Sequence, residues 1–245
     1  MLYGLLILII LALGIYIVEQ RKELKIKLKA AADNGVGEFL ISLISQGTIS
    51  RLEWFNFLNK SAEKGGILFV GDSLTQEFLL EEYFADKLVY NRGIGGDTTE
   101  GLLKRMDESI YALNPSKMFL LIGTNDLAIN ISGPDKIVEN IKSIIIKTKE
   151  RCRDTAIYVE SLYPTATTGY NDLSEEALRN RANYAIDIIN EKLEVLCKQL
   201  EVNYININRK LKDEEGKLKL EYTRDGLHLN PNGYEIVIDC LKNYM

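Results

Sequence analysis

The sequence of 245 residues predicts an α/β protein with a central parallel sheet of about five strands. Short apolar runs rich in β-forming residues recur from residue 67 onward, and stretches of helical length separate them. Strands that alternate with helices in this way form parallel sheets with helices on both faces. We therefore expect one α/β domain over residues 65–245, with a separate apolar helix at the N-terminus.

The expected strands and helices alternate along this domain. Strands are expected at Ile67–Val70, Leu88–Tyr90, Met118–Ile122, Ile157–Leu162 and Tyr204–Ile207. Helices are expected at Thr99–Leu113, Lys136–Arg151, Glu176–Leu200 and Asn232–Asn243. Right-handed crossovers bring the carboxyl ends of parallel strands to one edge of the sheet, so functional residues should gather there.

Residues 1–18 form a separate segment. Leu2–Val18 carries no charged residue and, at about 1.5 Å per residue, is just long enough to cross a bilayer. We expect a transmembrane anchor here, and two alternatives stay open. Ala12 and Gly14 fit the small residues of a signal-peptide cleavage site, and a helix that is apolar all round could also be buried in a protein core.

Residues 19–64 are expected to connect this segment to the domain through helical or irregular structure. The basic residues that follow the apolar run are Arg21, Lys22, Lys25, Lys27 and Lys29. They could cover a solvated helix face, or they could bind anionic head groups and place the domain on the cytoplasmic side of a membrane. Further along, Trp54, Phe55 and Leu58 have the spacing of residues that pack on a core.

Composition excludes several functions. A net charge of −5 argues against a nucleic-acid partner, which would require a basic surface. Cys152, Cys197 and Cys240 are odd in number and widely spaced, so they imply neither a disulfide framework nor a zinc site. His228 is the only histidine, which excludes sites that need two or more histidine ligands.

A serine follows the first expected strand. The motif Gly-Asp-Ser-Leu at residues 71–74 places Ser73 on a strand-to-helix turn, where a nucleophile would be presented at the edge of the sheet. Thr75 stands where the GxSxG elbow of other hydrolases has its second glycine. Asp and Ser are also common helix N-caps, so this motif alone does not establish catalysis.

Two loops after the second and third strands could supply hydrogen-bond donors. The glycine-rich turn at residues 93–96 could present backbone N–H groups to a phosphate or to a developing negative charge. It is not a GxGxxG turn, which argues against a dinucleotide. Asn125, in the Gly-Thr-Asn-Asp motif at 123–126, could donate from its side-chain amide, although Asn-Asp pairs are also ordinary turn residues.

The motif Asp-Gly-Leu-His at residues 225–228 pairs a carboxylate with the single histidine. Residues three apart in a tight turn can meet, so Asp225 would hold one ring nitrogen of His228 and leave the other as a base. A lone histidine is more often structural than catalytic, but no other histidine in the chain could act as this base.

Together and in this chain order, the four motifs resemble those of the SGNH (GDSL) hydrolase family. The resemblance covers residues 67–245. It implies a three-layer α/β/α flavodoxin-like fold with strand order 2-1-3-4-5. It also implies a catalytic triad of Ser73, His228 and Asp225.

The resemblance further implies an oxyanion hole made by the N–H groups of Ser73 and Gly96 and the amide of Asn125. We prefer Gly96 to Gly95 because the pair Asp-Thr follows it, as in members of the family. The implied activity is the hydrolysis of carboxylic esters, either acyl or acetyl esters of lipids, carbohydrates or small molecules, with no metal or cofactor. Tyr163–Ser174 would be either a loop over the site that sets specificity or a plain surface loop.

The expected partners are an ester substrate and, through the N-terminal helix, a membrane. Two other functions stay open. One is a non-catalytic domain that keeps the fold, and the other is a phosphate- or nucleotide-binding flavodoxin-like domain, which the turn at 93–96 would serve.

Overall fold

The computed structural model describes residues 42, 45–128, 133–166, 178 and 180–245. The chain forms two units, Met1–Gln46 and Gly47–Met245, and the sheet belongs to the second. The expected apolar helix Leu2–Val18, the basic residues after it and residues 167–174 of the expected loop all lie outside the described part. Within that part, no helix is long and apolar enough to cross a membrane.

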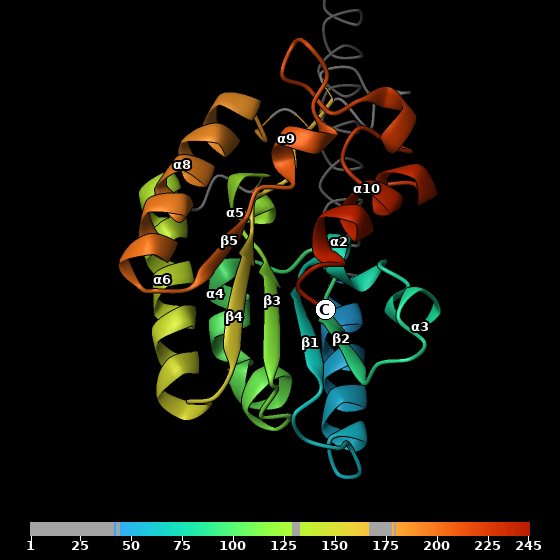
Figure 1. Ribbon diagram of the computed structural model, residues 1–245, viewed down its shortest axis with the longest axis vertical. Helices are drawn as coiled ribbons and strands as arrows, with labels where there is room; N and C mark the ends of the chain where they lie inside the picture. The colour runs from blue at the N-terminus through green and yellow to red at the C-terminus, as the bar shows by residue number, and fades with distance from the viewer. Residues whose placement is uncertain (1–41, 43–44, 129–132, 167–177, 179) are drawn as a thin grey trace, which may run out of the picture. The chain divides into compact units, whose positions relative to one another are not determined.

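Five strands form one sheet in the order β2-β1-β3-β4-β5 (Figure 1). The strands are β1 (Ile67–Gly71), β2 (Val89–Gly93), β3 (Lys117–Leu121), β4 (Ala156–Glu160) and β5 (Asn203–Ile205). Every neighbouring pair is parallel. The α/β class and the parallel sheet expected from the sequence are therefore confirmed, as is the strand order that the family resemblance implied.

Helices connect each strand to the next. They are α2 (Ser73–Gln76), α3 (Leu80–Tyr83), α4 (Thr99–Lys104), α5 (Thr124–Ala128), α6 (Pro134–Arg151), α8 (Asn183–Gln199), α9 (Asn208–Leu211) and α10 (Pro231–Leu241). A π-helical turn, η1 (Asp107–Tyr111), follows α4, and a 3-10 turn, η2 (Leu220–Tyr222), precedes α10. Residues 47–58 are also helical. Helix α6 packs against both α4 and α8, whereas α10 lies beside α2 (Figure 1).

Two of the expected helices are shorter in the structure, and side-chain hydrogen bonds explain why. The expected helix Thr99–Leu113 ends as an α-helix before Arg105, whose side chain turns inward and binds backbone carbonyl groups. Within the expected stretch Glu176–Leu200, helix α8 starts at Asn183, after non-helical residues at 180–182. The Asn183 side chain exchanges two hydrogen bonds with the backbone of Thr165, at 2.9 and 2.8 Å, which fixes this start.

The expectation that Trp54, Phe55 and Leu58 all pack on a core is wrong for two of them. Phe55 is buried beneath the guanidinium groups of Arg51 and Arg92, whose Cζ atoms lie 4.9 and 4.6 Å from its ring centroid. Trp54 is 59% exposed and Leu58 45% exposed. Phe55 is therefore the one residue of the three whose side chain is buried.

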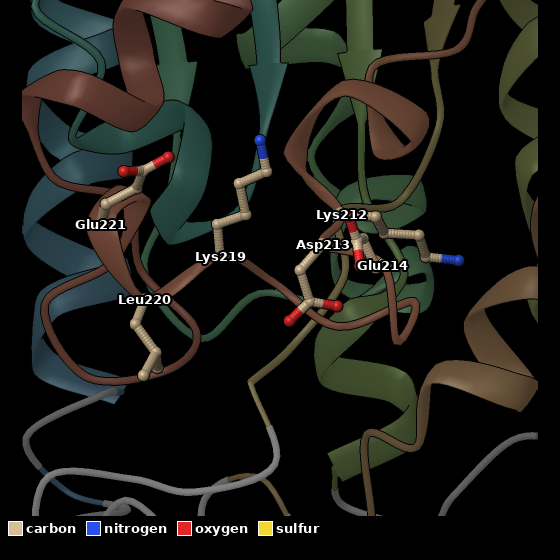
Figure 2. A pocket seen from close by; sticks show the side chains of 6 residues that line it. All are labelled: Lys212, Asp213, Glu214, Lys219, Leu220 and Glu221. Carbon is tan, nitrogen blue, oxygen red and sulfur yellow. The ribbon is translucent and has the colours of Figure 1, made fainter.

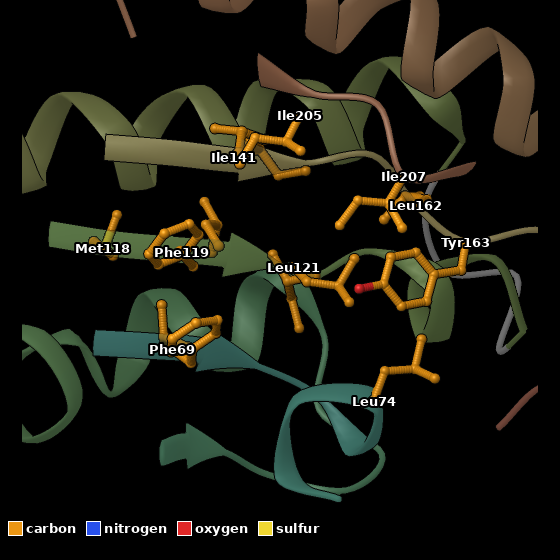
Figure 3. Packing of buried hydrophobic residues seen from close by; sticks show 14 of the residues in the cluster. Phe69, Leu74, Met118, Phe119, Leu121, Ile141, Leu162, Tyr163, Ile205 and Ile207 are labelled. Carbon is orange, nitrogen blue, oxygen red and sulfur yellow. The ribbon is translucent and has the colours of Figure 1, made fainter. Parts of the chain in front are cut away.

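Aromatic rings stack across neighbouring strands of the sheet, and Figure 3 shows two of them, Phe69 and Phe119. Phe69 of β1, Phe119 of β3 and Tyr158 of β4 are neighbours in register. The ring centroids of Phe69 and Phe119 are 4.6 Å apart, and those of Phe119 and Tyr158 are 4.8 Å apart. Phe78 and Tyr234 stack at 5.1 Å, and Phe78 meets Phe69 edge-on, which joins α10 to these rings. Aromatic pairs of this kind stabilise a sheet beyond the area they bury.

Aliphatic side chains of α6 and α8 form a second buried layer of the core. Ile137, Ile141 and Ile144 of α6 are fully buried, as are Ile186 and Ile189 of α8. Their spacing of three or four residues places them on one stripe of each helix. The sheet is thus enclosed well enough to hold the carboxyl ends of its strands in a fixed register.

A buried carboxyl group lies at the end of β4. Glu160 is 4% exposed, and the hydroxyl of Tyr163 donates to its Oε2 at 2.6 Å. Burial raises the pKa of Glu160 to about 7, although the hydrogen bond from Tyr163 opposes this. The folded protein therefore keeps a proton that the unfolded chain, with a pKa near 4.5, has already lost at neutral pH.

We predict that Glu160→Gln makes stability less dependent on pH. The stability contributed by the protonated Glu160 is complete below about pH 4.5 and is lost as the pH rises through about 7. Gln accepts the same bond from Tyr163 and does not titrate. Relative to the wild type, the variant should gain on the order of 3 kcal/mol in free energy of unfolding between pH 4.5 and 8, as measured by urea denaturation. Parallel pH profiles of the two proteins would contradict the assignment.

Candidate active site

The candidate residues gather at the carboxyl ends of three adjacent strands. Ser73 lies just beyond the end of β1, Gly96 beyond β2, and Asn125 beyond β3. The sheet order puts β1 between β2 and β3, so these three loops are neighbours. The sequence-based expectation that they share one edge is confirmed.

The turn that carries Ser73 requires a glycine before it. A Cβ on Gly71 would lie 2.0 Å from the carbonyl oxygen of Leu121 and 2.4 Å from Oγ1 of Thr75. The ends of β1 and β3 therefore approach more closely than any other residue would allow. Asp72 then caps α2 by accepting a hydrogen bond from the Leu74 amide at 3.0 Å, and Ser73 begins the helix.

Ser73, His228 and Asp225 form a continuous chain of hydrogen bonds. Ser73 Oγ lies 3.0 Å from His228 Nε2, and His228 Nδ1 lies 2.7 Å from Asp225 Oδ2. The residues come from two segments 155 positions apart in the sequence. A carboxylate on Nδ1 selects the ring tautomer that leaves Nε2 free to accept the serine proton.

The turn that holds His228 is built from its own side chains. Thr223 Oγ1 accepts the amide N–H of Gly226 at 2.9 Å and donates to the carbonyl of His228 at 2.7 Å. Asp225 Oδ1 accepts the amides of Leu227 and His228, at 3.0 and 2.7 Å. One carboxylate thus binds both the backbone and the ring of the histidine, which leaves little freedom in the ring's orientation.

These bonds decide the ionisation of Asp225. Burial of its carboxyl disfavours the charged form, but the bonds from the His228 ring and from the His228 and Leu227 amides outweigh burial. The pKa of Asp225 is therefore lower than its ordinary value. The group stays ionised at neutral pH, as a partner of a positively charged imidazole must be.

The glycine turn after β2 offers one backbone donor. Gly95 donates its N–H to Oε1 of Gln76 at 2.9 Å, so that group is engaged. Gly96 adopts a positive φ of 77°, and among the residues that the structure describes no acceptor binds its N–H. The geometry is consistent with the choice of Gly96 over Gly95.

Asn125 is held from two sides. Its Nδ2 donates to the carbonyl of Asp97 at 3.0 Å, and its Oδ1 accepts from Nη2 of Arg181 at 2.8 Å. The side chain is nearly buried. Nδ2 carries two hydrogens, so one remains for a ligand after the bond to Asp97.

Sequence reasoning missed the residues that hold these loops. Arg105 is buried and donates to the carboxylate of Asp97 at 2.7 Å and to the carbonyl of Gly71 at 2.9 Å. Asp126 accepts the N–H and the hydroxyl of Thr99. The only sequence signal was the spacing of Asp97 and Arg105, eight residues apart at a helix start, which by itself indicates no contact.

Asp72 is fully buried beside the serine. Its Oδ2 accepts no hydrogen bond within the described part of the chain. Burial raises the pKa of Asp72 to about 7, with Asp97 and Asp126 adding repulsion, while the Leu74 amide and Arg181 oppose the shift. The candidate site therefore has a carboxyl group that changes charge near neutral pH.

A separate surface hollow of about 540 Å³ lies in residues 212–221. Its lining is Lys212, Asp213, Glu214, Lys219, Leu220 and Glu221 (Figure 2). Its lining carries lysines and acidic residues in similar number. Ser73, His228 and Asp225 do not line it. The candidate active site is therefore placed by the Ser73–His228 contact and not by this hollow.

Comparison with known proteins finds a family match and several similar proteins. The model of the GDSL-like lipase/acylhydrolase family matches residues 69–236. The chain is 27% identical over 176 residues to platelet-activating factor acetylhydrolase IB subunit alpha2 of Rattus norvegicus, a match that covers 69% of this chain and 70% of that protein. It is 25% identical over 172 residues to N-acylneuraminate cytidylyltransferase of Escherichia coli O18:K1:H7, covering 70% of this chain but 38% of that protein.

A solved structure from Streptococcus pneumonia, named for platelet activating factor, is similar over most of its length. The TM-score is 0.78 and the sequence identity 31%, and the match covers 84% of this chain and 96% of that chain. All four motifs lie within residues 69–236, the part of the chain that the family model matches.

Proposed function

Because this chain belongs to the GDSL-like lipase/acylhydrolase family, we propose that it hydrolyses carboxylic esters through an acyl-enzyme on Ser73. The observation that carries the proposal is the chain of hydrogen bonds from Ser73 Oγ to His228 Nε2 and from His228 Nδ1 to Asp225. A serine hydroxyl is a weak nucleophile unless a base removes its proton during attack. The contact at 3.0 Å puts that base within reach.

In the proposed acylation step, His228 takes the Ser73 proton as the hydroxyl oxygen attacks the ester carbonyl. Asp225 holds the imidazole by Nδ1 and stabilises the positive charge that develops on it. His228 then gives the proton to the departing alkoxide, and the acyl group stays on Ser73. Water attacks the acyl-enzyme with His228 again as the base, which releases the acid.

The negative charge that develops on the ester oxygen needs preorganised donors. We assign this role to the backbone N–H groups of Ser73 and Gly96 and to Nδ2 of Asn125. The assignment is supported by the Gly96 N–H, which binds no acceptor among the described residues, and by the second hydrogen of Asn125 Nδ2. Donors of this kind, fixed before the reaction, stabilise the transition state more than the substrate.

For the substrate we propose acetyl and other short acyl esters of a lipid, carbohydrate or small alcohol. The similarity to platelet-activating factor acetylhydrolase IB subunits supports an acetyl group over a long acyl chain. A panel of esters that differ in acyl length and in alcohol would test this. A preference for long acyl chains would contradict it.

We predict that Ser73→Ala loses on the order of 10⁶-fold in kcat, as triad serines do. The wild-type enzyme should also be labelled by a fluorophosphonate at Ser73, because only an activated serine reacts with it. Ser143→Ala serves as a control, since Ser143 is half-buried on α6 and its hydroxyl donates to the Glu139 carbonyl of the same helix. An alanine variant at position 73 that keeps a tenth of the esterase activity would rule out the mechanism.

We predict that Asn125→Ala lowers kcat by roughly 10²–10³-fold with little change in KM, because the lost donor acts on the transition state. Asn190→Ala is a matched control: this asparagine is as buried as Asn125 and also donates and accepts, but it binds the backbone of Leu162. Its loss should lower stability and leave kcat of the folded enzyme unchanged. A loss confined to KM would assign Asn125 to substrate binding instead.

We also propose that residues 2–18 anchor the protein in a membrane, with the basic residues after them on the cytoplasmic side. The uncharged run and the following lysines and arginines support this.

The anchor predicts that the full chain sediments with membranes and resists carbonate extraction. Protease treatment of intact and permeabilised cells reports which side the domain occupies. Recovery of a shortened, freely released protein would show that the segment is a cleaved signal peptide.

A further inference from the structure

Arg181 is a buried cation at the candidate active site that no sequence motif indicated. It lies two residues before α8 and is 8% exposed. Its backbone is fixed locally, since its N–H donates to the carbonyl of Leu178 and its own carbonyl accepts from the Thr165 hydroxyl, both at 2.9 Å. Its guanidinium donates through Nη2 to Oδ1 of Asn125 at 2.8 Å.

We propose that Arg181 is a positioning residue for the oxyanion hole: it sets the direction in which the Asn125 amide points and polarises it. The inference rests on the proposed ester hydrolysis and adds to it a residue that acts through Asn125. The two ends of an asparagine amide are nearly equal in size, so packing alone does not choose between them. In the reversed orientation, Oδ1 would face the developing oxyanion and repel it.

The two neighbours of Asn125 both exclude the reversed orientation. A guanidinium can only donate, so Arg181 must face Oδ1. A backbone carbonyl can only accept, so Asp97 must face Nδ2. Because both constraints agree, the remaining hydrogen of Nδ2 has one fixed direction, as a preorganised donor requires.

The charge of Arg181 strengthens this donor. A hydrogen bond from a cation to Oδ1 draws electron density from the amide, which makes the Nδ2 hydrogens more positive. Arg181 and Asn125 are both nearly buried, so solvent screens the effect little. A neutral donor at the same place would orient the amide but polarise it less.

Arg181 has a second possible role, which the experiment must separate from the first. Its positive charge interacts favourably with the carboxylates of Asp72 and Asp225. A residue that served only to neutralise these groups would affect the stability of the turn that holds His228. Its effect on kcat would then not depend on Asn125.

The test is a double-mutant cycle on the full chain, with p-nitrophenyl acetate as substrate. Arg181→Met removes the guanidinium donor and keeps an unbranched apolar stem. We expect it to lower kcat by about 10- to 100-fold, less than loss of the Asn125 donor itself, with KM within about twofold. In the Asn125→Ala background the same change should lower kcat by less than about twofold, because its target is gone.

Arg92→Met is the matched control. Arg92 is also buried and donates through Nη2 to the Oδ1 of an asparagine, Asn59, at 2.9 Å, but this pair lies beside Phe55. Its substitution should lower the melting temperature and leave kcat of the folded enzyme unchanged. The comparison separates loss of a buried guanidinium from loss of this particular contact.

An equally large loss of kcat in the wild-type and the Asn125→Ala backgrounds would overturn the inference, as would a wild-type kcat for Arg181→Met.

If Arg181→Met does not fold, Arg181→Lys replaces it in the cycle. Lysine keeps the charge toward Asp72 and Asp225, but its Nζ ends one bond short of the position of Arg181 Nη2. The contact with Oδ1 of Asn125 is then lengthened, so kcat should fall at least about threefold, again only when Asn125 is present. A wild-type kcat for this variant would equally overturn the inference. The kcat values of Ser73→Ala and Asn125→Ala test the proposed ester hydrolysis and do not involve Arg181. A failure of the proposed hydrolysis can therefore be told apart from a failure of the proposed role of Arg181.

Discussion

Arg105 donates hydrogen bonds to the carbonyl oxygens of Gly71 and Arg92 and to the carboxylate of Asp97. These groups lie at the end of β1, at the end of β2 and in the glycine turn that follows β2. A guanidinium taken out of water must find such partners, because an unpaired buried charge costs about 3–5 kcal/mol. The position of Ser73 relative to Gly96 therefore depends on this one side chain, since each lies within two residues of a group that Arg105 binds.

The acidic residues near Arg105 have raised pKa values because they are buried at the edge of the sheet. Burial raises the pKa of Asp97 and of Asp126, although Arg105 opposes the shift at Asp97 and Thr99 opposes it at Asp126. Asp225 differs, because three donors surround a half-exposed carboxylate and lower its pKa. The contrast follows from burial together with hydrogen bonding to the charged form, because Asp225 is half-exposed and accepts three bonds whereas Asp72 is fully buried and accepts one amide.

The pattern of the sequence predicted most of the fold. The expected strands fall within one to three residues of those observed, because buried parallel strands read as continuous apolar runs. The helices were less well predicted where a side chain binds the backbone instead of solvent, as Arg105 and Asn183 do. Trp54 and Leu58 were assigned to a core from spacing alone, and spacing cannot tell which side of a helix meets the sheet.

The candidate catalytic residues could be named from local sequence motifs: one serine after the first strand, one histidine, and a carboxylate three residues before it. Such motifs are local, so the contact of Asp225 with the backbone of its own turn follows from short-range geometry. The contacts between distant segments, such as Ser73 with His228 and Asn125 with Arg181, could be seen only in the folded structure. Those contacts depend on where the crossovers and the packing of the helices bring each segment. The periodicity of apolar residues along the chain does not predict these positions.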